Sequence, residues 1–201
     1  MGKLVRMINS KQDYINFLEA DRVALGKPIY SLKILLIEYL KVDMLWKFQR
    51  LLRKAEYFKN VRSQKTLIGK IRYILIKRKF KKASLKLGFS IPENVFGPGL
   101  AIMHYGTIII NPRTKVGANC RIHACVNIGE SGGKAGAPII GNNVYIGPGA
   151  KIYGDITIPN NSAIAANAAV SKSFFNEGVV LGGVPAKEIG KVDIRQIIKH
   201  I

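Results

Sequence analysis

The sequence has few of the residues from which disulfide frameworks, metal sites and membrane spans are built. Its 201 residues include two cysteines, Cys120 and Cys125, and three histidines, with no Cys/His cluster of zinc-site spacing. The most apolar run, residues 34–37, is four residues long, whereas a membrane-spanning helix needs about 20. No apolar stretch of the kind found in signal peptides follows the basic residues Lys3 and Arg6. We therefore expect a protein of the reducing cytoplasm that binds no metal.

Acidic residues are also few, and the resulting excess of basic residues lies in one half of the chain. The sequence has 32 Lys and Arg against 12 Asp and Glu, a net charge of +20. Residues 1–90 hold 22 basic and 6 acidic side chains, whereas residues 91–201 hold 10 and 6. Such a concentration is either a solvated helical surface or a docking surface for an anionic lipid membrane or an acidic glycan. Nucleic acid is the least favoured partner, because no known nucleic-acid-binding motif accompanies the charge.

The basic half of the chain has helical periodicity. Ser10 can cap a helix that starts at Lys11 and ends at the Gly-Lys-Pro segment 26–28. A second helix is expected over about 31–58 and a third over about 63–87. In the second helix we expect one apolar face, and basic residues on the other faces: Lys47, Arg50, Arg53 and Lys54. The third helix carries seven basic residues beside four apolar ones, and the apolar ones are Leu67, Ile71, Ile74 and Leu75. Residues 1–88 are thus predicted to form a basic α-helical region.

The second half of the chain is an internal repeat with a period of six residues. Aliphatic residues recur at this spacing, and a small or β-branched residue precedes most of them by two positions. An amphipathic helix, with a period of 3.6, cannot produce this register. The pattern predicts a β-solenoid with three short strands per coil, the aliphatic residues inside and Gly or Asn at the corners, as in 142–143 and 160–161. The aliphatic positions are Ile110, Val116, Ile122, Ile128, Ile140, Ile146, Ile152, Ile158, Ile164 and Val170.

A Gly-rich segment, 130–139, interrupts the repeat. Ile128 and Ile140 are twelve residues apart, so one side of the solenoid carries six extra residues and the register then resumes. A long excursion of this kind from a rigid scaffold is more often functional than incidental, although a tolerated surface loop would have the same composition.

The histidines are the candidate catalytic residues, because the sequence has no nucleophile elbow, phosphate-binding loop, HExxH motif or paired carboxylates. His104 lies six residues before Ile110, where the six-residue period predicts an aliphatic residue. A polar ring at such a position indicates a functional role. His123 stands where glycine is expected, about one coil further on, so the two imidazoles are expected to be neighbours. An imidazole can take a proton from a hydroxyl near neutral pH. Cys120 is expected in the core, and His200 lies in the C-terminal tail, 192–201.

Several motifs together resemble the hexapeptide-repeat acyltransferases of the left-handed β-helix class, in the branch of the serine acetyltransferases. They are HYGTIIIN at 104–111, VNIGESGG at 126–133, IGNNVYIGPGAKIYGDITI at 140–158 and GGVPAKEIG at 182–190. The resemblance covers roughly residues 88–191, and the helical segment WKFQRLLRKAEYF at 46–58 is also similar to that branch. It implies a left-handed parallel β-helix over 89–191, a homotrimer with active sites between neighbouring subunits, and acetyl-CoA as donor.

The resemblance also implies roles for individual residues. His104 matches the catalytic histidine, which deprotonates the acceptor hydroxyl for direct attack on the thioester. The residues matched to the pantetheine arm are Gly129, Gly149, Ala150 and Ala166. Lys172 and Lys187 are candidates for the CoA phosphates, which a flexible ammonium group suits. The same glycines and alanines are also what the fold requires.

The chain departs from the serine acetyltransferase pattern around the acceptor. No aspartate stands near Ser90 or immediately before His104, and Glu93 is the only nearby acid. Gly136 and Ala137 precede Pro138 where the family has an Arg-His pair. Since an amino-acid acceptor needs charged partners, we expect the acceptor to be a sugar hydroxyl of a surface polysaccharide. The acceptor-binding candidates are then Tyr105, Asn127 and His123.

Two alternatives remain open. The first is a serine O-acetyltransferase of cysteine biosynthesis, and the terminal Ile201 is consistent with it. The second is a non-catalytic trimeric scaffold that binds anions through its helical half. Under the sugar hypothesis the basic helices would hold the protein at the inner face of the membrane or attract an acidic glycan.

Overall fold

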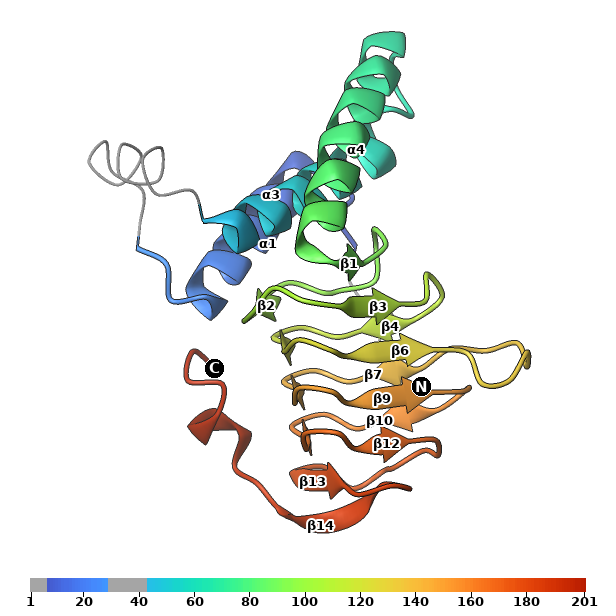
Figure 1. The fold of residues 1–201 in the computed structure, drawn as a ribbon. Coiled ribbons are helices and arrows are strands. Elements are labelled where there is room, and N and C mark those ends of the chain that lie inside the picture. Colours follow the sequence, from blue (N-terminus) through green and yellow to red (C-terminus); the bar gives the residue numbers. More distant parts are fainter. Residues whose placement is uncertain (1–6, 29–42) are drawn as a thin grey trace.

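The structure, a computed structural model, describes residues 7–28 and 43–201 and consists of a helical group at one end of a parallel β-helix (Figure 1). The helices are α1 (Lys11–Ala24), α3 (Met44–Tyr57) and α4 (Leu67–Leu87), and a short π-helical turn, η1 (Phe58–Arg62), joins the last two. The first helix is as predicted, whereas the third starts four residues later than expected. The first part of the second predicted helix lies outside the described residues.

The helix ends follow from local side-chain chemistry. The Ser10 hydroxyl accepts a hydrogen bond from the Asp13 N–H at the start of α1. The Thr66 hydroxyl does the same for the Gly69 N–H at the start of α4, and this cap explains why the helix begins after the π-helical turn. Gly88 ends α4 in the left-handed conformation, with φ of 77°. The division of the chain at residue 88 stays a prediction.

The β-helix has three faces made of short strands. Face A consists of β1 (Phe89–Ser90), β3 (Ile108–Ile110), β6 (Asn127–Gly129), β9 (Lys151–Tyr153) and β12 (Ala169–Val170). Face B consists of β4 (Lys115–Val116), β7 (Ile139–Ile140) and β10 (Thr157–Ile158). Face C consists of β2 (Ala101–Ile102), β5 (Arg121–Ile122), β8 (Tyr145–Ile146), β11 (Ala163–Ile164), β13 (Val179–Gly182) and β14 (Lys187–Lys191). All pairs are parallel except β13 with β14, which is antiparallel.

The aliphatic residues of the repeat fill the β-helix interior as predicted. All ten are at most 2% exposed, and the small or β-branched residues two positions before them are buried as well. The register also resumes after the Gly-rich loop, because Val116 pairs with Ile140 across the six extra residues.

Ile128 lies at the middle of this interior, in register with Ile110 and Ile152 of the adjacent coils. Ile128→Val is therefore expected to lower the free energy of unfolding by about 0.5–1.5 kcal/mol, since one buried methylene is removed. Urea denaturation measures the change. The matched control is Ile139→Val, at a side chain 51% exposed, where a change above about 0.5 kcal/mol would contradict the assignment of the core.

Two asparagine corners anticipated from the sequence form part of a hydrogen-bonded ladder along the β-helix. Asn119, Asn143 and Asn161 have left-handed backbone, with φ of 57°, 56° and 56°. The Asn119 side-chain amide donates to Asn143 at 2.9 Å, and that of Asn143 donates to Asn161 at 2.8 Å. The ladder ends where the Asn161 amide donates to the Glu177 carboxylate at 3.0 Å.

A buried arginine fastens the helices to the first coil. Arg53 of α3 is fully buried, and its Nε donates to the Asp21 carboxylate of α1 at 2.8 Å, while Nη1 donates to Glu56 at 3.0 Å. Its guanidinium also donates to the backbone carbonyls of Phe96 and Gly97. Asp21 in turn accepts hydrogen bonds from the N–H groups of residues 99 and 100. The expected position of Arg53, on a face away from the apolar one, is wrong, because the side chain is fully buried.

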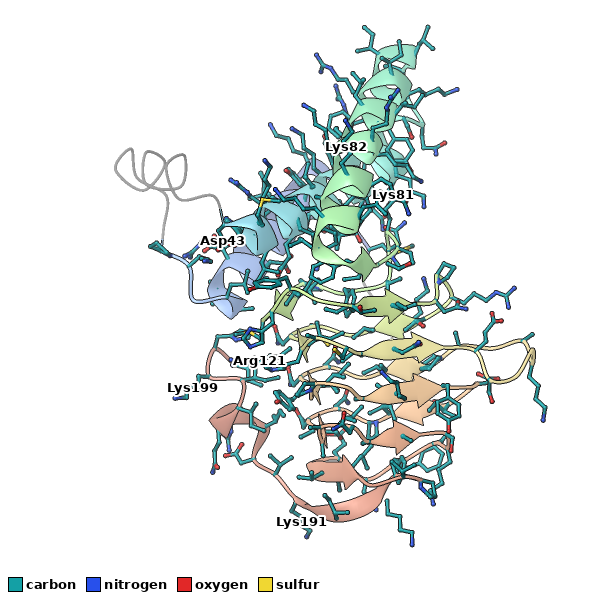
Figure 2. The ribbon with its side chains drawn as sticks, in the orientation of Figure 1. Asp43, Lys81, Lys82, Arg121, Lys191 and Lys199 are labelled. Carbon is teal, nitrogen blue, oxygen red and sulfur yellow. The ribbon has the colours of Figure 1, made fainter. Side chains whose placement is uncertain are left out.

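The C-terminal segment returns along face C. It contains the 3₁₀ turn η2 (Ile194–Gln196), and Ile194 and Ile198 pack against Ala163. Arg121 Nη1 donates to the Ile197 carbonyl at 3.0 Å, and Figure 2 shows Arg121 on the side of the β-helix that this segment covers. None of the helices in the described part of the chain is both long and apolar enough to cross a membrane.

Candidate active site

The predicted catalytic residues lie along one corner of the β-helix. This corner, called the histidine corner below, consists of the turns that lead from face C to face A: 103–107, 123–126, 147–150 and 165–168. Backbone hydrogen bonds stack the turns on one another, such as Gly149 N–H to the Ala124 carbonyl at 3.0 Å. His104, Tyr105 and His123 belong to its first two turns, and Asn127 begins the face A strand that follows. The structure therefore brings all four residues to the same corner.

The expected position of His104 in the solenoid register is wrong. Ile102, not His104, pairs with Ile122 and fills the interior. The spacing from Ile102 to Ile110 is eight residues, whereas the corresponding spacing in the next coil, from Ile122 to Ile128, is six residues. The two extra residues let the turn bulge outward, so that His104 and Tyr105 are exposed. His104 is therefore open to an acceptor molecule, which suits a catalytic base better than a core position would.

The two histidines are neighbours, as predicted. The ring centroids of His104 and His123 are 5.5 Å apart, with an angle of 45° between the planes. On the other side, His123 makes an edge contact with Tyr145, with the centroids 5.1 Å apart. Successive coils thus contribute one ring each to a column of three. Sequence analysis missed Tyr145, although the residue directly before the repeat position Ile146 could have been placed once the coil register was known.

The surroundings of His123 favour its neutral form. Burial lowers the pKa of His123, and the nearby His104 and Arg121 lower it further. Its Nε2 atom is buried and has no hydrogen-bond partner among the described residues. A neutral imidazole beside His104 can exchange a proton or a hydrogen bond with its neighbour without adding a charge to the site.

These shifts predict a loss of stability in mild acid. Burial also lowers the pKa of His200, and Arg121 adds to the effect. Because the ordinary histidine pKa is about 6.5, the unfolded chain binds protons below that pH that the folded chain does not bind. The free energy of unfolding is therefore expected to fall as pH drops through 6.5 toward 5.5, as measured by urea denaturation at each pH. Replacing both histidines by glutamine should flatten this part of the profile, and an unchanged slope would contradict the assignment.

Glu93 does not take the place of the family's orienting aspartate. Its carboxylate accepts hydrogen bonds from the Tyr73 hydroxyl at 3.0 Å and from Lys59 at 3.2 Å, and Lys77 lies at 3.4 Å. All of these partners belong to the helical group. The acid is therefore part of the helix packing, and His123 is the titratable ring that contacts His104.

The residues matched to the pantetheine arm divide between two corners. Gly149, Ala150 and Ala166 belong to the histidine corner, one and two coils beyond His123. Since coils stack at about 4.8 Å, three steps from the His104 turn to Ala166 span roughly 14 Å. Ala150 is fully buried, so only its backbone is available there. Gly129 lies at the far end of β6, at the base of the Gly-rich loop, and not at the histidine corner.

The two lysines assigned to the CoA phosphates line the same hollow. Its volume is about 380 Å³, and its wall includes Lys172, Phe174, Phe175 and Lys187. Lys172 lies over the Phe174 ring, with Nζ 5.4 Å from the centroid, so its direction is fixed by a cation–π contact. The hollow thus offers two ammonium groups and two aromatic rings, beside the carboxylate of Glu188.

Of the two cysteines, the exposed Cys125 lies in the second turn of the histidine corner, whereas Cys120 is in the core. Cys120 is buried as expected, and burial raises its pKa well above the ordinary thiol value, so it is not an accessible nucleophile. No group of three or more His, Cys, Asp or Glu within residues 7–28 and 43–201 could hold a metal ion.

Comparisons with known proteins agree with the repeat and the fold. Residues 137–172 match the family "Bacterial transferase hexapeptide (six repeats)". A serine acetyltransferase of Mycobacterium tuberculosis is 38% identical over 102 residues, which are 50% of this chain and 44% of that protein. One from Staphylococcus xylosus is 35% identical over 136 residues, covering 66% and 62%. The chain thus spans between two fifths and two thirds of the length of these relatives.

Solved structures extend the similarity to the helices. The crystal structure of the serine acetyltransferase from Brucella abortus in complex with coenzyme A superimposes with a TM-score of 0.67 and 25% identity. The match covers 90% of this chain and 70% of that one. The chain is a hexapeptide-repeat protein with a left-handed parallel β-helix after a helical region, which confirms the predicted fold class. Within that class it is similar to serine acetyltransferases.

The prediction of a polysaccharide sugar as acceptor is wrong, because these relatives are serine acetyltransferases. The prediction rested on charged side chains missing at a few fixed positions. A positive charge for the carboxylate of an amino-acid acceptor can also come from a residue at another position. Arg121, two residues before His123 on β5, is close enough to lower the pKa of that histidine, and its Nε is buried without a partner among the described residues.

Proposed function

We propose that the chain is an acetyl-CoA-dependent O-acetyltransferase that acts on the hydroxyl of L-serine. The observation that carries the proposal is the contact between the exposed His104 and His123, with ring centroids 5.5 Å apart, at the histidine corner. The similarity to serine acetyltransferases supports the same activity. Of the alternatives, the non-catalytic scaffold has no such support.

In this proposal His104 is the general base. Acetyl-CoA supplies an acetyl group already activated as a thioester. The His104 imidazole accepts the proton of the acceptor hydroxyl, so that the hydroxyl oxygen forms the new ester bond as the carbon–sulfur bond breaks. His123 holds the His104 ring in position through the contact between them, and its lowered pKa keeps it neutral meanwhile. The protonated His104 then returns its proton to the departing thiolate.

The described residues fit the donor along the β-helix axis. From the His104 turn, the histidine corner extends over roughly 14 Å to Ala166, and the backbone at Gly149, Ala150 and Ala166 lines its later part for the pantetheine arm. The hollow with Lys172 and Lys187 is assigned to the phosphates. Gly129, at a different corner, supports a homotrimer in which a neighbouring subunit brings that corner to the site. Tyr105 and Asn127 are the acceptor-binding candidates, and Arg121 is the candidate partner for a carboxylate.

The test is release of free thiol from acetyl-CoA by the purified full chain. L-serine is expected to stimulate the release at least tenfold over the rate without acceptor, whereas L-alanine, which lacks the hydroxyl, should have no effect. Mass spectrometry of the product should find one acetyl group on serine. Equal rates with serine and alanine would overturn the proposal.

The site of action is proposed to be the cytoplasm. Contact with an anionic membrane surface is a separate proposal. The positive charge of the helical half supports it, and the exposed face of α4 is the surface that would make the contact.

A further inference from the structure

One helix of the structure presents a row of large apolar side chains to solvent. In the first turns of α4, Leu67, Ile71, Ile74 and Leu75 are 73%, 51%, 56% and 55% exposed. Their spacing of four, three and one residues puts them on one side of the helix. Figure 1 shows α4 extending away from the β-helix, so this row lies at the far end of the molecule.

The exposed row is separate from the side of α4 that packs in the core. Gly69, Phe80, Ala83, Ser84 and Leu87 are the buried residues of that side. At 100° per residue, their directions centre nearly opposite the exposed row. The helix therefore has two apolar faces, of which the body of the protein covers one.

Basic side chains surround the uncovered face. Helix α4 contains eight Lys and Arg and no Asp or Glu. By the same geometry, Lys70 and Lys77 flank the apolar row on one side, and Arg72 and Lys79 flank it on the other. Arg78 and Lys82 continue the row toward the β-helix. Among the described residues, the ion pair of Lys77 with Glu93 is the only one that a side chain of α4 makes.

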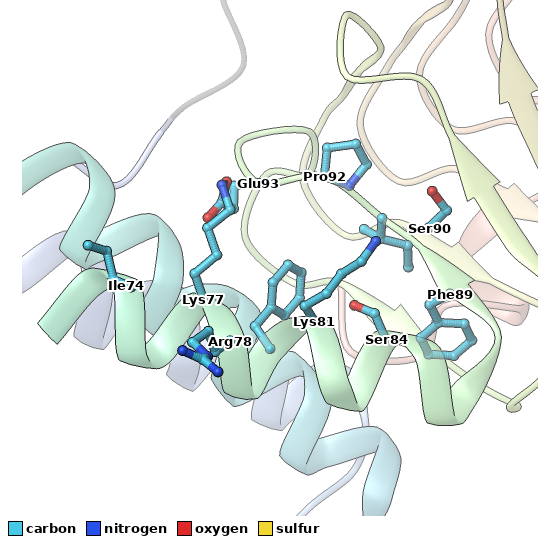
Figure 3. Close-up of a pocket in the computed structure, with 11 residues that line it drawn as sticks. Ile74, Lys77, Arg78, Lys81, Ser84, Phe89, Ser90, Pro92 and Glu93 are labelled. Atoms are coloured by element: carbon cyan, nitrogen blue, oxygen red, sulfur yellow. The ribbon is translucent and has the colours of Figure 1, made fainter. Parts of the chain in front are cut away.

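An apolar groove lies beside this surface, where α4 meets the first coil. It has a volume of about 530 Å³, and its walls include Phe80, Phe89 and Ile91. Figure 3 shows Lys77, Arg78 and Lys81 along the helix that forms its edge. The groove thus combines an apolar interior with an edge that carries three cationic side chains and the carboxylate of Glu93, which pairs with Lys77.

We propose that the uncovered face of α4 binds the surface of an anionic phospholipid bilayer. The apolar row enters the boundary between headgroups and acyl chains, and the flanking Lys and Arg bind the lipid phosphates. A solvated helix would account for the charges but not for four large apolar side chains more than half exposed. A second copy of the chain is a poorer partner, because its α4 would bring eight further positive charges and no negative one. The proposal does not depend on the acetyl-transfer reaction.

Vesicle co-sedimentation of the full chain tests the proposal. Vesicles of phosphatidylcholine with 30% phosphatidylglycerol are expected to bind the protein at least tenfold more tightly than vesicles of phosphatidylcholine alone. Raising the salt from 0.1 to 0.5 M should weaken the binding at least tenfold, since the Debye length falls. Equal binding to both vesicles, or none to either, would overturn the proposal.

Two pairs of variants locate the surface. Ile71→Ser with Leu75→Ser should weaken binding to the anionic vesicles at least tenfold, whereas the control Ile15→Ser with Val23→Ser, at apolar residues exposed on α1, should change it less than twofold. Arg78→Gln with Lys82→Gln should also weaken it tenfold, whereas Lys191→Gln with Lys199→Gln, which removes the same charge elsewhere, should not. Circular dichroism checks that each variant is folded.

Light scattering separates the lipid surface from a second copy. The α4 variants are expected to keep the molecular mass of the wild type and its rate of thiol release in the absence of vesicles. If Ile71→Ser with Leu75→Ser lowers the mass while leaving vesicle binding unchanged, the face is an interface between copies and the proposal is wrong. Controls that lose as much binding as the α4 variants would also overturn it.

Discussion

Replacing His104 by alanine is expected to lower the turnover of acetyl transfer by about 10²- to 10⁴-fold. A positioned general base contributes a factor of this size, and alanine removes the imidazole without disturbing the exposed turn that carries it. The measurement is steady-state thiol release with saturating acetyl-CoA and L-serine. The KM for acetyl-CoA should stay near that of the wild type, because the residues assigned to the donor lie further along the β-helix.

The matched control is His200→Ala, which removes the same side chain from the C-terminal segment, where no role in the reaction is assigned to it. It should keep the wild-type rate at pH 7.5. If His104→Ala instead retains the wild-type rate, His104 is not the base. If the wild type also has no turnover with serine, the non-catalytic scaffold becomes the better interpretation.

Arg53→Ala is expected to lower the free energy of unfolding by about 3–5 kcal/mol. The substitution leaves two carboxylates, those of Asp21 and Glu56, in a buried site without their cation, and it removes the donors to two backbone carbonyls of the first coil. Guanidinium denaturation followed by circular dichroism measures the loss. The effect is large because Arg53 joins α1, α3 and the β-helix at a single point.

Arg195→Ala provides the exposed counterpart, since Arg195 pairs with Asp193 in solvent. Its effect on the free energy of unfolding should be small, because solvent screens an exposed ion pair. A loss below about 1 kcal/mol for Arg53→Ala would show that water reaches the two carboxylates. Combining Arg53→Met with Asp21→Asn and Glu56→Gln should recover part of the stability, because no unpaired charge is then buried.

The repeat was the part of the fold that the sequence predicted best. A period of six residues is unusual, and each aliphatic position in it has one structural role, so the ten core residues could be identified without any knowledge of pairing. The position of His104 could not be found in the same way. The first coil has two extra residues between Ile102 and Ile110, and a constant period cannot reveal them. Only the pairing of Ile102 with Ile122 shows that the turn bulges outward.

The helical half was harder to predict, because position on a helix does not say what packs against it. Arg53 was expected among the basic side chains away from the apolar face, although it is buried against acids from two helices. In α4, the apolar residues picked out by spacing include Leu67 and Ile71, which are exposed, whereas Phe80 and Leu87 form the buried side. Tyr145 was missed because its neighbour in space, His123, lies 22 residues earlier in the sequence.

The two ends of the β-helix differ in a way that bears on aggregation. Any stack of parallel strands has open hydrogen-bonding groups at its ends, and identical molecules could join there into a fibre. At the first coil, Arg53, Asp21 and Gln49 already bind the backbone groups of residues 96–102. At the last coil, β14 runs antiparallel to β13, so an arriving molecule would meet a strand of the wrong direction. The chain therefore limits its own polymerisation with polar caps at one end and a reversed strand at the other.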